Sequence, residues 1–290
     1  MADKSLASLN WLLRLKAIYD SLKTTEKRAA DYIIRNSRDV CSMTISQAAR
    51  DIDCSEATLF RLSKKVGFSG YPQLREACRS IKTESDTNLY LDIDPADSSE
   101  QVLSKVFSTT VLTLQNTQKM INLRDFETAV KHIRNSVCLS FYAIGGASSV
   151  ATIGFYKFNR IGWRCTFYGD PDLSLISASQ LKEGDAAVAI SHSGRSKPVI
   201  DSVKLAKRSG AAVITITNFP LSPLAKTSDV VLLTSAFAEY SSGDVFANRV
   251  AQLCILESLY AGVVTSLQRN DPARLSGIPD VNRTININKL

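Results

Sequence analysis

Short apolar runs alternate with amphipathic helical segments over the second half of the chain, and this alternation constrains the fold more than any other feature. The runs are strand-length and β-rich, and they stand at 137–144, 164–168, 186–190, 212–217 and 230–234. Strands that alternate with helices form a parallel sheet whose two faces are both covered. The sequence therefore predicts an α/β domain.

The first third of the chain has a different pattern, because residues 9–82 contain consecutive short helical segments and no strand-length run. Residues 83–99 are polar and acidic and include a proline, which is linker composition. Long helices are expected at about 100–121, 125–134 and 246–268. The predicted organisation is a helical domain, a linker, an α/β domain and a C-terminal tail, with bounds 1–82, 83–99, 100–270 and 271–290.

The net charge of +7 is unevenly placed. Residues 1–85 hold fifteen Lys and Arg against ten Asp and Glu, whereas the remaining 205 residues hold twenty against eighteen. A basic excess in the helical part is what a polyanion partner requires, although a solvated basic surface gives the same count. The charge distribution is therefore consistent with a nucleic-acid partner and does not distinguish it from a solvated basic surface.

Cysteine and histidine spacing excludes several classes of site. The six cysteines form no Cys-x-x-Cys pair, and the two histidines are far apart. We therefore expect reduced thiols, no metal site and no cofactor. The N-terminus lacks a signal-peptide layout, and the uncharged run 135–156 is broken by glycines and serines. These features predict a cytoplasmic protein with no membrane partner.

Residues 44–66 carry a helix-turn-helix pattern. Thr44 and Gln47 form a capping box, and the apolar residues that follow lie on one helical face. Asp53 and Cys54 provide a turn, and Ser55 caps the second helix. On that second helix the apolar and cationic residues fall on opposite sides, which is what reading of the DNA major groove needs.

The predicted DNA contacts follow from this placement. Residues early in the second helix reach base edges and later cations meet phosphates. The predicted DNA-binding set is Thr44, Ser55, Glu56, Ala57, Thr58, Arg61, Lys64 and Lys65. The first two are helix caps, the next four are placed near bases, and the two lysines are placed on the DNA backbone. A plain three-helix cluster with an exposed basic face is the alternative.

This segment resembles the N-terminal domain of RpiR-type bacterial transcription regulators. The resemblance is carried by Thr-Ile-Ser-Gln-Ala-Ala from Thr44, by Ser-Glu-Ala-Thr-Leu-Phe-Arg from Ser55 and by Lys-Val-Gly-Phe-Ser-Gly-Tyr from Lys65. Asp53 stands where that family usually has glycine in the turn. Because Asp tolerates a left-handed backbone better than most residues, we expect the turn to survive.

Two serine-rich loops follow two of the predicted strands. The first is Gly145-Gly-Ala-Ser-Ser149, and we expect Ser148 and Ser149 to cap the next helix. The second is Ser191-His-Ser-Gly-Arg-Ser196. In an open α/β sheet both loops stand beyond the carboxyl ends of strands, where ligands collect, and hydroxyls with free N–H groups at a helix start suit a phosphate. For the first loop alone, an ordinary strand-to-helix turn is the simpler interpretation.

The spacing Ser-x-Ser-Gly-x-Ser resembles the phosphate loop of the sugar isomerase (SIS) domain, and the resemblance covers roughly residues 105–268. It implies a three-layer αβα sandwich with a five-stranded parallel sheet that binds phosphosugars and usually dimerises. It also implies that serines of both loops hold the phosphate. Glu239, which follows the last strand, is a candidate for sugar hydroxyls or a solvated loop acid. The predicted effector-binding set is Gly146, Ser148, Ser149, Ser191, His192, Ser193, Gly194, Ser196 and Glu239.

Two functions remain open from the sequence. The first is a transcription regulator, not an enzyme, that binds a double-stranded operator and senses a phosphorylated sugar. As a homodimer or homotetramer it would read an inverted repeat, with the helices at 100–121 and 246–268 as interface candidates. The second is an aldose–ketose phosphate isomerase, which needs a positioned base. Candidates for that base are Glu239, Glu257 and His192.

Overall fold

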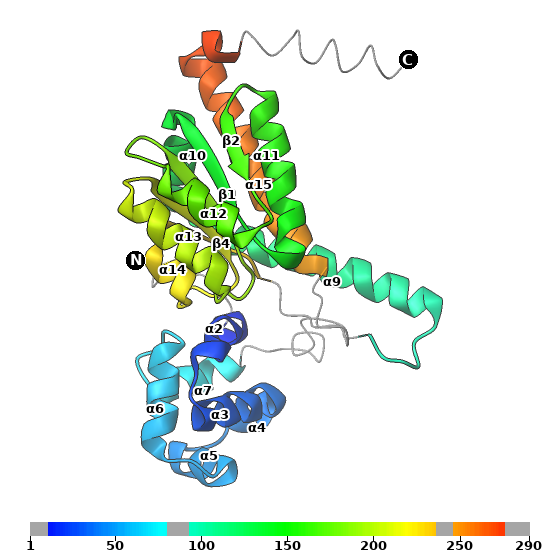
Figure 1. Ribbon diagram of the computed structural model, residues 1–290. Coiled ribbons are helices and arrows are strands. Elements are labelled where there is room, and N and C mark those ends of the chain that lie inside the picture. The colour runs from blue at the N-terminus through cyan, green and yellow to red at the C-terminus, as the bar shows by residue number, and fades with distance from the viewer. Residues whose placement is uncertain (1–10, 80–92, 236–245, 276–290) are drawn as a thin grey trace. The chain divides into compact units, whose positions relative to one another are not determined.

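The computed structural model describes residues 11–79, 93–235 and 246–275 (Figure 1). By its contacts the chain divides into two units, Met1–Met120 with Ser235–Ala247 and Ile121–Thr234 with Asn248–Leu290. The long helix α9, Ser99–Met120, falls in the first unit, whereas the sequence analysis placed it in the α/β domain. The domain bounds expected from the sequence remain predictions.

The first unit is helical, as predicted. Its short helices pack around one core that includes Leu15, Ala30, Leu62 and Leu74, all fully buried. Besides α9, the α-helices in the described part of this unit are α2 (Trp11–Ile18), α3 (Thr24–Arg35), α4 (Ser37–Val40), α5 (Ile45–Ile52), α6 (Glu56–Lys65) and α7 (Tyr71–Arg79).

The second unit holds a five-stranded parallel sheet in the order β2-β1-β3-β4-β5. Each strand lies within the run predicted for it, and the differences at the ends are two residues at most. The strands are β1 (Cys138–Tyr142), β2 (Arg164–Phe167), β3 (Ala186–Ile190), β4 (Ala212–Thr217) and β5 (Val230–Leu233).

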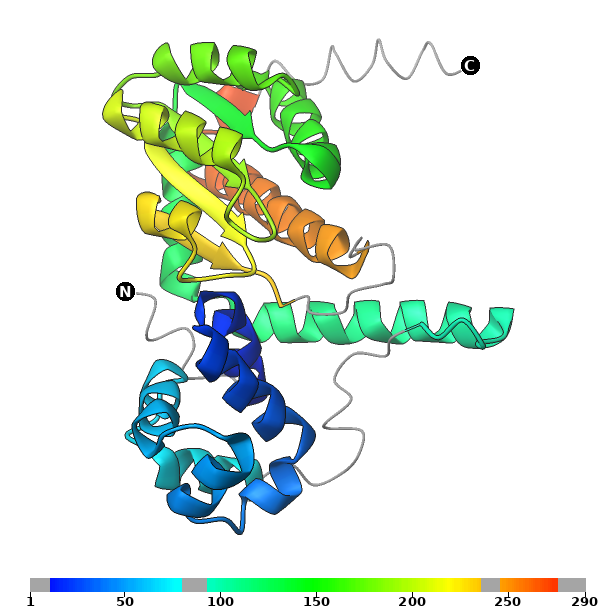
Figure 2. The same ribbon diagram turned by 60° about the horizontal axis from the view of Figure 1, so that its bottom comes forward.

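Helices cover both faces of the sheet, so the three-layer sandwich is confirmed (Figures 1 and 2). One face packs against α10 (Leu123–Asn135), α11 (Ser148–Arg160) and α15 (Phe246–Asn270). The other packs against α12 (Pro171–Ser179), α13 (Lys197–Arg208) and α14 (Pro223–Thr227). The central strand β3 is buried along its whole length, which explains its uniformly apolar sequence.

Helix α15 is long and apolar enough to cross a membrane by length and composition. Its residues Ile255, Leu259, Val263 and Leu267 are buried in the core against the sheet. The helix is therefore a core helix of the α/β unit. After it, a 3-10 turn at Pro272–Leu275 places Arg274, whose guanidinium donates to the carbonyls of Arg134 and Ser136. Arg274 thus ties the first residues of the expected tail to the C-terminal end of α10.

Candidate functional sites

The predicted helix-turn-helix forms as its caps require. Thr44 Oγ1 accepts a hydrogen bond from the Gln47 N–H at 3.3 Å, and Gln47 Oε1 accepts from the Thr44 N–H at 2.8 Å. Asp53 ends α5 with φ 55° and ψ 56°, so it adopts the left-handed conformation expected of it. Arg28 of α3 pairs with the Asp53 carboxylate and also donates to its carbonyl. Ser55 Oγ caps α6.

The exposed face of α6 carries four of the predicted DNA-contact residues, which are Glu56, Ala57, Arg61 and Lys64. Glu56 accepts a hydrogen bond of 2.5 Å from Ser46 of α5, which holds its carboxylate toward the first helix. Thr44 and Ser55 are exposed residues whose hydroxyls serve the caps. These positions are compatible with contact to a groove.

Thr58 does not lie on that face. Its side chain is buried, and its hydroxyl is within 2.9 Å of Ser55 Oγ. The sequence placed it near bases because it is early in the helix, but its position on the helical circumference turns it toward the core. The structure therefore assigns Thr58 to the cap and not to the DNA-reading face.

Lys65 is also placed differently from the prediction. Its Nζ lies 2.8 and 2.7 Å from the two carboxylate oxygens of the buried Glu26 on α3. Burial of Glu26 opposes its charge, but the hydrogen bonds from Lys65 and the Lys23 N–H prevail and hold the pKa of Glu26 below its ordinary value. Lys65 therefore ties α6 to α3, and this bond competes with any phosphate contact.

The second serine loop runs from the end of β3 to the start of α13. Ser191 is buried, and its N–H donates to the Ile216 carbonyl at 3.1 Å. Gly194 has φ +60°, a conformation that favours glycine. Ser193 Oγ accepts from the Arg195 N–H at 3.3 Å, while the buried Oγ of Ser196 has no hydrogen-bond partner in the described residues. A buried hydroxyl without a partner, at the start of a helix, is suited to an incoming acceptor.

This loop is held from behind by the segment that follows β4. The His192 carbonyl accepts from Thr217 Oγ1 and from the Asn218 N–H, both at 3.0 Å. The Gly194 carbonyl accepts from the Leu224 N–H at 3.1 Å. A Cβ added at Gly194 would lie 2.2 Å from Ser222 Oγ. The loop backbone therefore has one well-determined path.

The first serine loop differs from the prediction. A 3-10 turn at Gly145–Ala147 leads directly into α11, so the cap position is Ala147 and neither serine caps the helix. Ser148 Oγ donates to the Ala143 carbonyl at 3.3 Å, and Ser149 Oγ donates to the Gly146 carbonyl at 2.8 Å. The 3-10 turn occupies the residues between the predicted strand and the serines, so both serines lie in the first turn of α11.

Arg249 of α15 reaches this first loop, which the sequence analysis missed. A Cβ added at Gly146 would lie 2.5 Å from a terminal nitrogen of the Arg249 guanidinium. Glycine at 146 thus makes room for a cation beside the loop. The sequence contains an indication of this role, because Arg249 is the one charged residue in the mostly apolar run 246–256.

The two loops stand at the same edge of the sheet. They follow β1 and β3, which are hydrogen-bonded neighbours, with Tyr142 opposite Ala189. The Arg249 side chain, helix starts and serine hydroxyls thus gather at the carboxyl ends of adjacent strands. This edge can receive a small anion.

The remaining candidates are distributed as follows. Glu239 lies outside the described residues. The His192 ring packs edge-on against Phe219, with centroids 5.6 Å apart. Glu257 forms an ion pair with Lys157, whose ammonium also lies over the Tyr260 ring. In the described ranges, no group of three His, Cys, Asp or Glu side chains could hold a metal ion.

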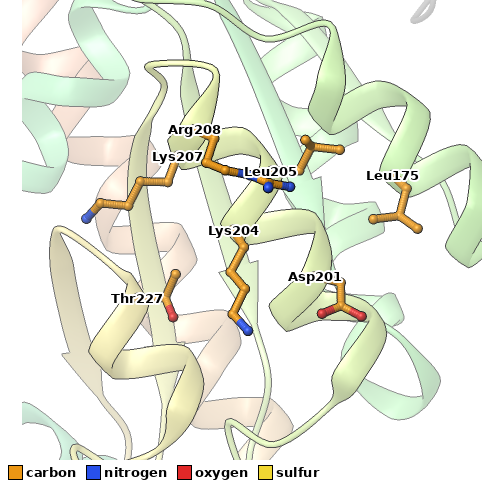
Figure 3. A pocket seen from close by; sticks show the side chains of 7 residues that line it. All are labelled: Leu175, Asp201, Lys204, Leu205, Lys207, Arg208 and Thr227. Atoms are coloured by element: carbon orange, nitrogen blue, oxygen red, sulfur yellow. The ribbon is translucent and has the colours of Figure 1, made fainter.

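A larger hollow of about 470 Å³ lies between α12, α13 and α14, and Figure 3 shows its lining. It includes Lys204 and Arg208 from the last two turns of α13, which end just before β4 begins. It therefore opens toward the amino ends of the strands and contains no residue of either serine loop. A second hollow of about 220 Å³ includes Cys138 and Asp185, at the same end. Neither hollow is part of the anion edge.

Comparison with known proteins agrees with this division. Residues 9–80 match the family described as "Helix-turn-helix domain, rpiR family", and residues 132–262 match the SIS domain. The HTH-type transcriptional regulator RpiR of Escherichia coli K12 is 30% identical over 251 residues, which cover 87% of this chain and 84% of that protein.

Two solved structures extend the comparison. The NanR protein of Vibrio vulnificus, solved in complex with ManNAc-6P, is 27% identical with a TM-score of 0.59, over 95% of this chain and 98% of that one. The sugar isomerase domain of an RpiR transcription factor from Sphaerobacter thermophilus shares the fold, with 19% identity and a TM-score of 0.57 over 63% of this chain and 99% of that one. The chain belongs to the RpiR family of helix-turn-helix transcription regulators with a SIS domain.

Proposed function

We propose that this regulator binds a DNA operator through α6 and that a phosphorylated sugar, bound at the two serine loops, controls that binding. The observation that carries the effector half is the buried Ser196 hydroxyl without a partner, in a loop whose backbone path is fixed from behind. The related NanR structure holds ManNAc-6P, which supports a phosphosugar as the ligand class. Arg249 is added to the proposed anion contacts because it stands over Gly146.

For the DNA half, the support is the exposed face of α6. Arg61 and Lys64 are exposed on the second helix of a well-capped helix-turn-helix. Such a helix places its outer face in the major groove, where arginine reads guanine and lysine neutralises phosphate. We therefore keep Glu56, Ala57, Arg61 and Lys64 as proposed DNA contacts and withdraw Thr58.

A second copy of the chain is the proposed partner. Leu103, Phe107 and Val111 recur every fourth residue along α9 and are 61%, 66% and 52% exposed. Three large apolar side chains in one stripe on a helix are costly in water and suit a two-fold contact. Helix α15, the other interface candidate, has buried Leu256 and Leu259 in the core instead. A dimer through α9 would present two copies of α6 to an inverted repeat.

The isomerase alternative has less support. Of its candidate bases, Glu257 is engaged with Lys157, and the His192 ring packs against Phe219. The structure relatives below 25% identity establish the fold of the sugar isomerase domain alone. The proposed cytoplasmic location follows from the regulator function, since the operator is there.

One experiment tests both halves. Full-length protein is mixed with fluorescent DNA from upstream of its own gene and adjacent operons, and anisotropy is recorded with and without a panel of sugar phosphates. We expect sequence-dependent binding, weakened or strengthened by one sugar phosphate and unaffected by the unphosphorylated sugar. The same panel is assayed for aldose–ketose conversion. Turnover without sequence-dependent DNA binding would reverse the assignment.

A further inference from the structure

An aromatic side chain lies on the exposed face of α6. Phe60 is 47% exposed, although phenylalanine is usually buried. At 100° per residue it lies between Glu56 and Lys64, with Ala57 and Arg61 further round the same face. An exposed phenylalanine does not stabilise a helix face that only contacts water, so its position suggests contact with a ligand or partner.

The Phe60 ring has neighbours both in the protein core direction and on its own helix. A Cβ at Gly70 would lie 3.3 Å from one ring carbon of Phe60, so the glycine lets the ring pack directly on the turn before α7. The Lys64 ammonium lies 5.6 Å from the ring centroid on the same helix. A side chain that packs against the protein on one edge and is exposed on the other loses little side-chain conformational entropy when it contacts a ligand.

Several polar residues of α6 have partners within the protein itself. Thr58 is turned inward, Lys65 is paired with Glu26, and Glu56 accepts from Ser46. What this part of the face offers to a ligand is therefore an apolar ring next to the Lys64 ammonium, with Arg61 further round the helix. The matching surface is an apolar group surrounded by negative charge.

The major groove presents one such group. Thymine carries a C5 methyl there, and every other group on the base edges is a hydrogen-bond donor or acceptor or an aromatic C–H. We infer that Phe60 is a specificity-determining residue that contacts the C5 methyl of a thymine in each operator half-site. This inference rests on the proposed DNA-binding function, and it adds an apolar contact to the arginine and lysine contacts proposed above.

The test begins by selecting an operator from a random DNA library with the full-length protein. Each thymine of the selected site is then replaced in turn by deoxyuridine, which removes only the C5 methyl. For the wild-type protein we expect one position per half-site where the replacement weakens binding about fourfold, the effect of one buried methyl group. At that position Phe60→Ala should bind thymine and uracil equally.

Two further variants keep the result interpretable. Phe60→Leu retains an apolar side chain and should keep part of the discrimination, and its melting temperature checks that α6 is intact. Leu123→Ala removes another exposed apolar residue, 67% exposed on α10, and should leave the uracil profile unchanged. These controls separate loss of the methyl contact from a general effect of surface truncation.

The outcomes distinguish a failure of the Phe60 inference from a role of Phe60 in a protein contact and from a failure of the proposed function. A wild-type protein insensitive to every uracil replacement overturns the inference while the DNA-binding proposal stands. The same uracil profile in Phe60→Ala as in wild type also overturns it, and a change in oligomeric state in Phe60→Ala would assign the ring to a protein contact. If wild type selects no sequence at all, the proposed function fails and the inference fails with it.

Discussion

The two serine loops leave adjacent strands of one sheet, and they differ in that only the second has a buried serine hydroxyl without a partner among the described residues. In the first loop Ser149 donates to the Gly146 carbonyl, three residues back in its own turn. In the second loop the backbone is held by groups from another segment, Thr217 and Leu224, and the Ser196 hydroxyl has no partner among the described residues. A loop supported from outside can keep a hydroxyl for a ligand, whereas a loop that supports itself uses its hydroxyls internally.

The comparison assigns different roles to the two loops. The second would bind the phosphate through side chains and N–H groups, and the first would contribute backbone and the neighbouring Arg249 cation. Their glycines differ accordingly. Gly194 is packed against Ser222, while nothing lies within 4 Å of a Cβ at Gly145, although both have positive φ.

The largest effect should come from Gly194→Ala. Its new Cβ would overlap Ser222 and would sit at φ +60°, so the external support of the loop would be lost. We expect the free energy of unfolding to fall by about 2 to 5 kcal/mol and sugar-phosphate binding to disappear. Urea denaturation and calorimetry measure the two effects.

Gly145→Ala is the matched control for this change. It has the same backbone cost and no overlap, so about 1 to 2 kcal/mol of stability should be lost. Equal destabilisation by the two substitutions would show that packing behind the second loop is not what distinguishes it.

Local features of the fold were predictable because they depend on residues close in sequence. The Thr44–Gln47 capping box, the left-handed Asp53 and the strand positions all follow from short-range patterns, and the structure confirms them. The serine caps of α11 were wrong even though they are local, because a 3-10 turn and a longer strand-to-helix path share the same composition.

Features that depend on distant residues could not be predicted in this way. Lys65 is exposed but is paired with Glu26, which lies 39 residues earlier, and its contact with DNA stays a prediction. Arg249 comes to the first loop from a helix about a hundred residues later, and nothing local places it there. A sequence does not show whether a lysine or arginine is available to a ligand or is paired with a carboxylate, because the pairing depends on the tertiary structure.

A smaller effect is expected from removing single hydroxyls. Ser196→Ala deletes a donor that we propose for the phosphate, so affinity for the sugar phosphate should fall by about ten- to a hundredfold. Ser149→Ala deletes a hydroxyl that serves its own loop, and affinity should change less than threefold. Titration calorimetry with the sugar phosphate from the panel compares the two. An equal loss in both variants would mean that the first loop also binds through its side chains.

An effect smaller than that of Ser196→Ala should come from substitutions of Gly146 and Arg249, and it tests whether the first loop acts through the cation beside it. Gly146→Ala would push the Arg249 guanidinium aside, and Arg249→Ala would remove it. Each should weaken sugar-phosphate binding by about three- to tenfold, and the double variant should be no weaker than Arg249→Ala because both changes remove the same interaction. Raising the salt concentration should narrow the difference from wild type, since the contact is between charges. If the double variant instead loses affinity by the product of the two single losses, Gly146 acts through its own backbone. The first loop would then bind the phosphate directly, as proposed for the second loop.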